Sequence, residues 1–382
     1  MSNRSKAQED HVLEAIYHDV SVFLPYVLSL KNHPGSSLLL QGTLPFNSLF
    51  IIESANAIDK LFPGFLNIEI DEGVSIKELV QPLYPLRQKA KMFDNANQPF
   101  SGILSELSDH INKHRSYFFD SGSGILSPVK RMLQADLGLF YYGSNIFANT
   151  HELSFNYGET FNFDNPDNKD IFSNRGYIIG RYATFVSHLF GFEMPDEIHV
   201  PKLELKTTMV DIKYESLYRR GIFKHVPLAC AASFAFLLSN LNQVISIISP
   251  AMQKEILPTV RVKLIIAYHV NSSLNSLQQL YFSKLSPEVQ SLFSQLLGSP
   301  ESHWLKKLRD LRNTMVHYYL DNWDKYNLPS GSNRIQVIEH LSRGKKLSEI
   351  NNALDKYISD ALVVLEQSFS LKGNPFWYGV VK

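Results

Sequence analysis

Residues 312–319, which read RNTMVHYY, bring together side chains that could cleave a phosphodiester bond. Arg312 carries a permanently charged fork that matches the oxygen atoms of a phosphate group. The imidazole of His317 can donate and accept protons near neutral pH. Asn313 could donate to a phosphate or hold the imidazole in one orientation, and Arg309 could bind a further phosphate. This set suits RNA cleavage without a metal, in which the 2′-hydroxyl loses a proton, the leaving 5′-oxygen gains one, and negative charge gathers on phosphorus.

The segment from Ser302 to Leu320 must position these groups, and its apolar spacing predicts one amphipathic helix. The predicted buried stripe consists of Trp304, Leu308, Leu311, Met315 and Tyr318. At about 100° per residue, the remaining face carries four polar side chains and one apolar side chain, namely Arg309, Arg312, Asn313, Val316 and His317. We expect this face, turned away from the predicted core, to contact a ligand or another protein surface.

The pattern R-N-x-x-x-H resembles the signature of the HEPN superfamily, whose members are small helical domains and often ribonucleases. That signature is an arginine, four to six residues and a histidine, commonly with a polar residue directly after the arginine. Arg312, Asn313 and His317 match it. In one branch, the toxins paired with a minimal nucleotidyltransferase, the pattern is R-x4-H-x-Y, and Tyr319 matches its tyrosine. The resemblance covers roughly residues 215–370.

The resemblance implies a metal-independent endoribonuclease of toxin–antitoxin or phage-defence type that needs no cofactor and leaves 2′,3′-cyclic phosphate ends. Arg312 and His317 would be its core, supported by Asn313. Because these two side chains lie about 140° apart around a helix, a homodimer with Val316 at its contact would gather two Arg/His pairs in one cleft. An antitoxin or a nucleotidyltransferase partner is a further expectation, with Tyr319 as a candidate modification site.

Two alternatives remain open for these residues. A non-catalytic HEPN-like module could use the same face to bind RNA or a protein partner. Arg312 and His317 could also be ordinary surface or packing residues, because a short motif arises by chance. Tyr319 could simply be packed at the edge of the core stripe.

Composition predicts a globular protein in a reducing compartment. The chain has 382 residues, 44% hydrophobic and 19% charged, which is long enough for two domains with their own cores. Its single cysteine, Cys230, lies in an apolar run and excludes an internal disulfide framework. The polar residues 1–10 lack a signal-peptide core, and the apolar run 228–238 is about half of a membrane span. We therefore expect a cytoplasmic protein that does not insert into a membrane.

Charge divides the chain at about residue 214. Residues 1–214 hold 18 Lys and Arg against 25 Asp and Glu, whereas residues 215–382 hold 19 against 12. A basic half that carries the Arg/His motif suits a polyanion such as RNA. We predict an N-terminal domain, 1–214, of unknown role, and a HEPN-like bundle of four or five helices, 215–382.

The fold class predicted from periodicity is mainly α. Apolar spacing predicts helices over 8–30, 75–94, 99–119, 128–137, 174–192, 227–248, 254–280, 287–297 and 347–369, in addition to the motif helix. The run 38–58 is either helix or strand. A loop with one or two short strands is expected between 138 and 170, an extended linker at 203–214, and a polar connector at 327–346.

Two other groups of residues could bind a metal by type but not by pattern. His110 and His114 have helical i, i+4 spacing, yet no carboxylate or cysteine completes a zinc set. The segment 164–170 is rich in Asp and Asn, but Pro166 stands at a ligand position of a calcium loop and the required glycine is missing. We read them as a solvated helix face and a polar loop, and expect no metal site.

Overall fold

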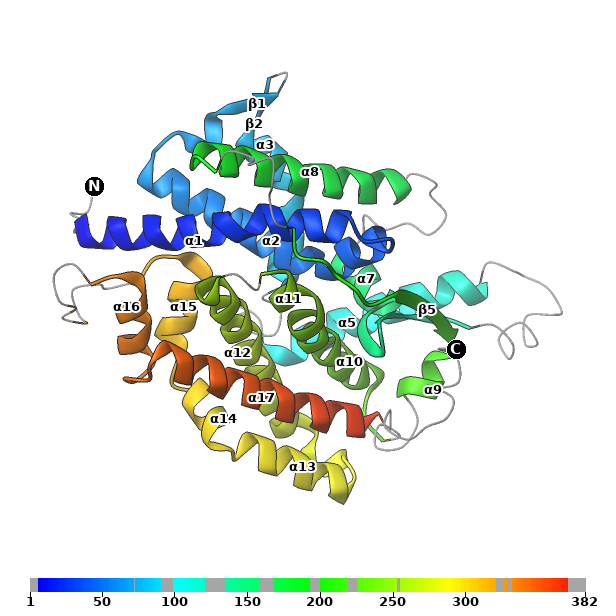
Figure 1. Cartoon of the computed structure of the whole chain (residues 1–382). Helices are drawn as coiled ribbons and strands as arrows, with labels where there is room; N and C mark the ends of the chain where they lie inside the picture. Colours follow the sequence, from blue (N-terminus) through cyan, green and yellow to red (C-terminus); the bar gives the residue numbers. More distant parts are fainter. Residues whose placement is uncertain are drawn as a thin grey trace.

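The computed structural model describes residues 6–71, 73–90, 99–120, 135–157, 168–192, 200–218, 225–252, 255–320 and 332–369, with the single positions 326 and 328. The described chain is mainly helical, which confirms the predicted fold class, and it contains two small antiparallel sheets. Figure 1 shows the helices of the first half lying over those of the second half, with the larger sheet at one side.

Long helices from the first half form one layer: α1 (Lys6–Lys31), α2 (Ser36–Leu61) and α8 (Asn168–Leu189). The run 38–58 lies inside α2 and is therefore helical. Shorter elements complete this half: η1 (Phe65–Asn67), β1 (Glu69–Asp71), β2 (Val74–Ser75), α3 (Ile76–Val80), η2 (Gln81–Leu83), α4 (Tyr84–Ala90), α5 (Phe100–Asp120) and α7 (Thr150–Tyr157). The helix expected over 128–137 falls mostly outside the described residues, and 135–137 are not helical.

The larger sheet has the strand order β4-β3-β5. Its strands are β3 (Leu137–Tyr142), β4 (Asn145–Asn149) and β5 (Thr207–Ile212). They lie at the expected short strands and the expected extended segment. On the edge strand β4, the carbonyls of Ile146 and Phe147 accept hydrogen bonds from Asn242 and Gln243 at 2.9 and 2.7 Å. These side-chain amides attach the sheet to the second half of the chain.

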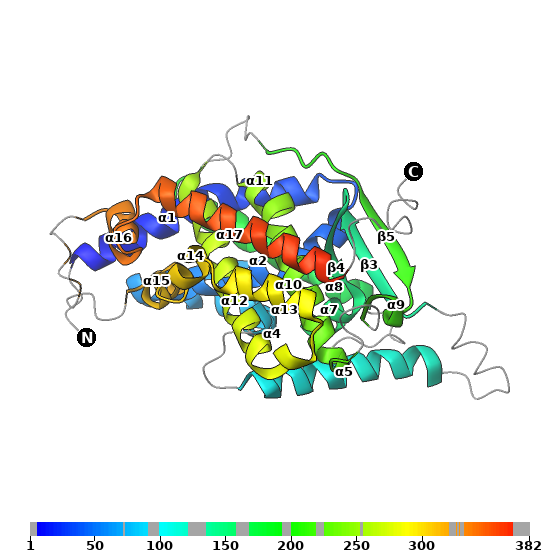
Figure 2. The same cartoon turned by 90° about the horizontal axis from the view of Figure 1, so that it is seen from below.

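The second half is a helical bundle. Its elements are α9 (Tyr214–Tyr218), α10 (Leu228–Gln243), the π-helical segment η6 (Val244–Ile248), α11 (Ser249–Ala251), α12 (Ile256–Tyr281), η7 (Phe282–Lys284), α13 (Pro287–Leu297), α14 (Pro300–Leu305), α15 (Arg309–His317), α16 (Arg334–Leu341) and α17 (Leu347–Ser368). Figure 2 shows α17 lying across α10, α12 and α13. α16 corrects the expected connector at 327–346, and it begins with a capping box between Asn333 and Gln336.

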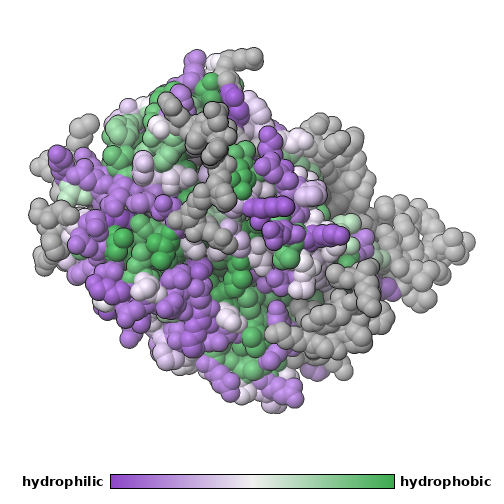
Figure 3. Space-filling model, viewed as in Figure 1, coloured by the Kyte–Doolittle hydropathy of each residue, from purple (hydrophilic) through white to green (hydrophobic). Residues whose placement is uncertain are grey.

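Hydrophobic packing crosses the predicted domain boundary at residue 214. One buried cluster joins the C-terminal bundle to α5, to β3 and to Leu49 of α2. The other joins α1, α2 and α8 to Val262, Tyr318 and Tyr319. The surface over this interior, in Figure 3, is largely hydrophilic with apolar patches between. The division into domains 1–214 and 215–382 stays a prediction, but the two parts do not have separate cores.

One described stretch, Leu228–Ala251, is long and apolar enough to cross a membrane by length and composition. In its most apolar window, 83% of the residues are buried inside the protein. It includes Cys230, which is a free, buried thiol. Burial lowers the stability of a thiolate, so the pKa of Cys230 rises to about 12. This packing is that of a core helix.

Candidate functional site

The motif helix is shorter than the sequence predicts. Instead of one helix from Ser302 to Leu320, α14 ends at Leu305 and α15 begins at Arg309. Between them, tight turns form, because Lys307 donates to the carbonyl of Trp304 and Leu308 to that of Leu305. The predicted apolar stripe is nevertheless buried, with exposures from 0% to 9% at Trp304, Leu308, Leu311, Met315 and Tyr318. The break therefore divides the predicted helix in two, but the apolar stripe still faces the core.

Two of the five residues on the opposite face of α15 are covered, which corrects that part of the prediction. Val316 is fully buried and Arg312 is 9% exposed. Both are covered within the same chain, because α2 and α12 pack against α15. Val316 therefore cannot be the contact of a homodimer in this conformation. Helices of the same chain thus cover the residue at which a second copy was expected to make contact.

The surface of α2 supplies a carboxylate to the motif histidine. Oε2 of Glu53 lies 2.7 Å from Nδ1 of His317, and its Oε1 accepts from Arg87 of α4 at 2.8 Å from Nε and 2.5 Å from Nη2. The Glu53 side chain is 4% exposed, whereas that of His317 is 40% exposed. One buried carboxylate thus connects an arginine to a histidine that stays open to solvent.

Arg312 lies beside this carboxylate but is packed rather than extended. Its Nη1 donates to Oδ1 of Asn313 at 2.6 Å, and its guanidinium lies 5.4 Å from the ring centroid of Tyr268 on α12. Burial lowers the pKa of Arg312 to about 10, against the opposing effect of Glu53, so it stays charged at neutral pH. Arg309, one turn earlier, is exposed. Burial raises the pKa of Tyr268, and the positive charge of Arg309 partly opposes that rise. Asn313 therefore orients the arginine, not the imidazole.

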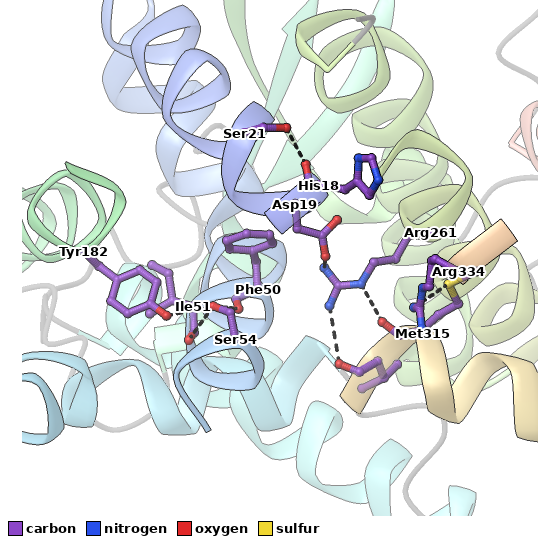
Figure 4. Close-up of polar contacts among 11 residues, drawn as sticks. His18, Asp19, Ser21, Phe50, Ile51, Ser54, Tyr182, Arg261, Met315 and Arg334 are labelled. Atoms are coloured by element: carbon purple, nitrogen blue, oxygen red, sulfur yellow. Dashed lines mark hydrogen bonds and ion pairs between the residues drawn. The ribbon is translucent and has the colours of Figure 1, made fainter. Parts of the chain in front are cut away.

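The end of α15 is held by a buried arginine from α12, shown in Figure 4. Arg261 donates from Nε to the carbonyl of Met315 at 2.5 Å and from Nη2 to that of Val316 at 3.4 Å. Its Nη1 pairs with Asp19 of α1 at 2.7 Å, and both side chains are 5% exposed. A cation at the last carbonyls of a helix is favourable. Arg261 therefore holds the last turn of α15, the turn that ends at His317.

The residue after His317 has an uncommon backbone conformation. Tyr318 has φ of 64°, in the left-handed region that bulky residues seldom adopt. Its ring is fully buried and lies 4.4 Å from the guanidinium carbon of Arg261. Such a conformation costs on the order of 1–3 kcal/mol and persists only where the surroundings impose it. The packing of Tyr318 thus sets the direction of the chain as it leaves the motif.

Tyr319, the candidate modification site, is 7% exposed. Its hydroxyl donates to the carbonyl of Ala57 on α2 at 3.1 Å, and Lys60 lies 4.8 Å from its ring centroid. A transferase could not reach this hydroxyl without movement of α2. The geometry agrees with the alternative of a tyrosine packed at the core edge.

Sequence reasoning did not assign Glu53, Arg87, Asp19 or Arg261 to the site. Glu53 and Asp19 did carry a signal, since each interrupts a run of apolar residues on a buried helix face. A carboxylate in such a place needs a charged or hydrogen-bonding partner. The partners Arg261 and His317 lie more than 240 residues away along the chain. The sequence around each carboxylate therefore does not indicate which residue it contacts.

The histidines considered for metal binding pack against different rings. His110 lies 5.3 Å from Phe155, and His114 lies 4.6 Å from His151, by ring centroids. Within the described ranges, no group of three or more His, Cys, Asp or Glu side chains is arranged to hold a metal ion. The Asp- and Asn-rich segment falls on 164–170, where 164–167 lie outside the described residues and 168–170 begin α8.

Buried histidines predict acid sensitivity of the fold. Burial lowers the pKa of His11 to about 2, of His114 to about 4, and of His151 well below its usual value. Below pH 6.5 the unfolded chain binds protons that the folded chain does not, so stability falls as pH falls. Each histidine costs about 1.4 kcal/mol per pH unit. Burial raises the pKa of Glu152 well above its usual value. Above about pH 4.5 the folded chain therefore binds a proton at Glu152 that the unfolded chain does not, and this offsets the effect of one histidine on stability.

We therefore expect the free energy of unfolding in urea to fall by roughly 2–3 kcal/mol between pH 6 and pH 5. His151→Gln should reduce this slope. The exposed control His303→Ala should leave it unchanged. Equal stability of the wild-type chain at pH 7 and pH 5 would contradict the assignment of neutral buried imidazoles.

Comparisons with known proteins add no relative: no family model, curated protein or solved structure matches the chain. The fold and site therefore define the protein only as a mainly helical chain in which a buried carboxylate from α2 holds a histidine at the end of α15.

Proposed function

We propose that the chain is a metal-independent endoribonuclease of toxin–antitoxin or phage-defence type, with His317 as its proton-transfer group. The observation that carries the proposal is the 2.7 Å contact between Oε2 of Glu53 and Nδ1 of His317, beside a charged Arg312. A carboxylate, an imidazole and guanidinium groups are the parts that a metal-free attack of a 2′-hydroxyl on phosphorus requires.

Glu53 gives the imidazole a defined orientation in this proposal. A carboxylate at Nδ1 favours the tautomer with its proton on that nitrogen and stabilises the imidazolium that forms after proton uptake. Proton transfer to and from RNA is then assigned to Nε2 of His317. The 40% exposure of the His317 side chain leaves room for RNA to approach.

Positive charge around the histidine would bind and stabilise the phosphate. Arg87 lies on the other oxygen of Glu53 with a side chain that is 22% exposed. Arg309 is exposed one turn before Arg312 and is the proposed first contact for an RNA phosphate. Arg312, which is nearly buried, would act on the developing charge mainly through its field rather than through a bidentate contact.

Homodimerisation stays a proposal, but it is no longer required to assemble the site. Glu53 and Arg87 come from the same chain as His317, so a second copy is not needed to bring a carboxylate and a further arginine to the histidine. Any homodimer would use a surface other than Val316. RNA remains the proposed partner in the cytoplasm, and an antitoxin or nucleotidyltransferase would have to act elsewhere than on the buried hydroxyl of Tyr319.

The alternative is a non-catalytic module that binds RNA or protein. The 9% exposure of Arg312 favours it, because a buried arginine is poorly placed to grip a phosphate. In that case the Glu53–His317 contact would serve to fasten α2 to α15. Retention of RNA binding without any cleavage would support this alternative.

The test is cleavage of mixed-sequence RNA by the purified full-length chain in EDTA. We expect cleavage to persist without divalent ions and to leave 2′,3′-cyclic phosphate and 5′-hydroxyl ends, because His317 would supply the proton transfers. The same oligonucleotide with 2′-deoxyribose throughout should remain intact, since it lacks the attacking hydroxyl. Loss of cleavage in EDTA, or equal cleavage of the deoxy oligonucleotide, would exclude the proposed chemistry.

A further inference from the structure

A pocket of about 450 Å³ lies away from the motif, between the end of α1, the start of α2 and the first half of α8. Its volume is in the usual range for small-molecule sites, about 300–1,000 Å³. The residues that line it are Val27, Leu30, Lys31, Ser36, Ser37, Leu40, Gln41, Leu44, Tyr157, Phe172, Ser173, Arg175, Gly176, Ile179 and Gly180. The catalytic proposal uses none of them.

The charged side chains among the described residues that line this pocket have one sign. Lys31 and Arg175 are its charged side chains, and none of the described residues that line it is acidic. The N-terminus of the 26-residue helix α2 also opens here at Ser36, with no acidic residue in its first turn and no side-chain cap. A helix N-terminus carries partial positive charge. All three features favour an anion.

Arg175 is incompletely satisfied by the protein. Its Nε is buried and has no hydrogen-bond partner within the described structure. Burial lowers the pKa of Arg175, and Tyr157 is the ionisable group that counteracts the shift. A buried donor on a charged group is costly when it has no acceptor. Arg175 lines the pocket, and the head group of an anionic ligand there would pair with its charge.

The walls of the pocket are apolar. They are formed by Val27, Leu30, Leu40, Leu44, Phe172 and Ile179. Gly180 contributes no side chain, and a Cβ built there would meet nothing within 4 Å. The pocket therefore combines a cationic part with an apolar space for the body of a ligand.

We propose that this pocket binds a medium-chain carboxylate, with its head group at Arg175 and Lys31 and its chain between α1, α2 and α8. The charge of the lining selects an anion, and the apolar walls select one with a hydrocarbon chain. Inorganic phosphate lacks the chain and decanol lacks the charge, so each tests one half of the proposal.

Isothermal titration of the full-length chain with decanoate, decanol and inorganic phosphate tests it without RNA. We expect decanoate to bind at least 10-fold more tightly than decanol, the order of magnitude of one charge-assisted hydrogen bond, and phosphate not to bind measurably. Arg175→Gln should weaken decanoate binding about 10-fold and leave decanol binding unchanged. Arg181→Gln, one charge lost on the same helix outside the pocket, is the matched control.

Gly180→Leu should fill the apolar part and abolish decanoate binding. Leucine favours helix over glycine, so α8 should not be weakened, and a thermal melt checks that the variant is folded. Absence of decanoate binding, equal binding of decanol and decanoate, or unchanged decanoate binding in folded Gly180→Leu would each overturn the proposal. Because the titration measures no cleavage, it can fail or succeed independently of the ribonuclease proposal.

Discussion

His317→Ala is expected to lower the rate of RNA cleavage by about 10²–10⁴-fold, the usual contribution of one general acid or base. The side chain is 40% exposed and its Nδ1 contacts Glu53, so the change removes the proton-transfer group without opening a large cavity. Single-turnover cleavage of a labelled RNA measures the loss. His303→Ala, an exposed histidine on α14, is the matched control and should cleave at the wild-type rate.

Glu53→Gln separates catalysis from packing in the same assay. The amide keeps the size of the side chain but loses the negative charge that orients His317 and pairs with Arg87. A loss of up to about 10⁴-fold is known when a carboxylate that orients a catalytic imidazole is changed to an amide. The loss should fall on kcat more than on KM. Wild-type cleavage by His317→Ala would end the ribonuclease proposal, whereas wild-type cleavage by Glu53→Gln alone would end only the role of the carboxylate.

Local sequence signals predicted those parts of the fold that local physics determines. α13 begins at Pro287 and ends at Leu297, as its proline start and following glycine indicate. The break at 306–308 was missed because it contains neither proline nor glycine, and its tight turns keep Leu308 in the buried stripe. α16 was missed because it is short and lies among polar residues, although Asn333 and Gln336 form a recognisable cap.

The candidate site was predicted only in part, for a different reason. The motif fixed Arg312, Asn313 and His317 on one helix, and that placement is confirmed. A helical wheel cannot tell which face meets solvent when a second layer covers the first. Here α2 and α12 pack against α15 and Val316 is fully buried, while Glu53 of α2 contacts His317 across 264 positions of sequence. Contacts of this kind follow from the packing of whole layers, which periodicity within one segment does not encode.

Arg261→Met is expected to lower the free energy of unfolding by about 3–5 kcal/mol, the usual cost of breaking a buried ion pair from one side. Asp19 would keep its charge in a place where its side chain is 5% exposed, and the last carbonyls of α15 would lose their donor. Methionine keeps most of the volume, so the loss reports on charge and hydrogen bonds rather than on a cavity. Urea denaturation at pH 7 measures it.

Two variants define what the Arg261→Met result means. Lys356→Met breaks surface pairs with Asp360 and Glu301, in which the Lys356 side chain is 56% exposed, and it should cost less than about 1 kcal/mol. Adding Asp19→Asn to Arg261→Met should restore part of the lost stability, because the carboxylate that lost its ion-pair partner is then neutral. If Arg261→Met costs no more than Lys356→Met, the buried pair does not hold α1 to the motif helix. If the double variant is less stable than Arg261→Met alone, the cost comes from lost hydrogen bonds and not from the stranded carboxylate.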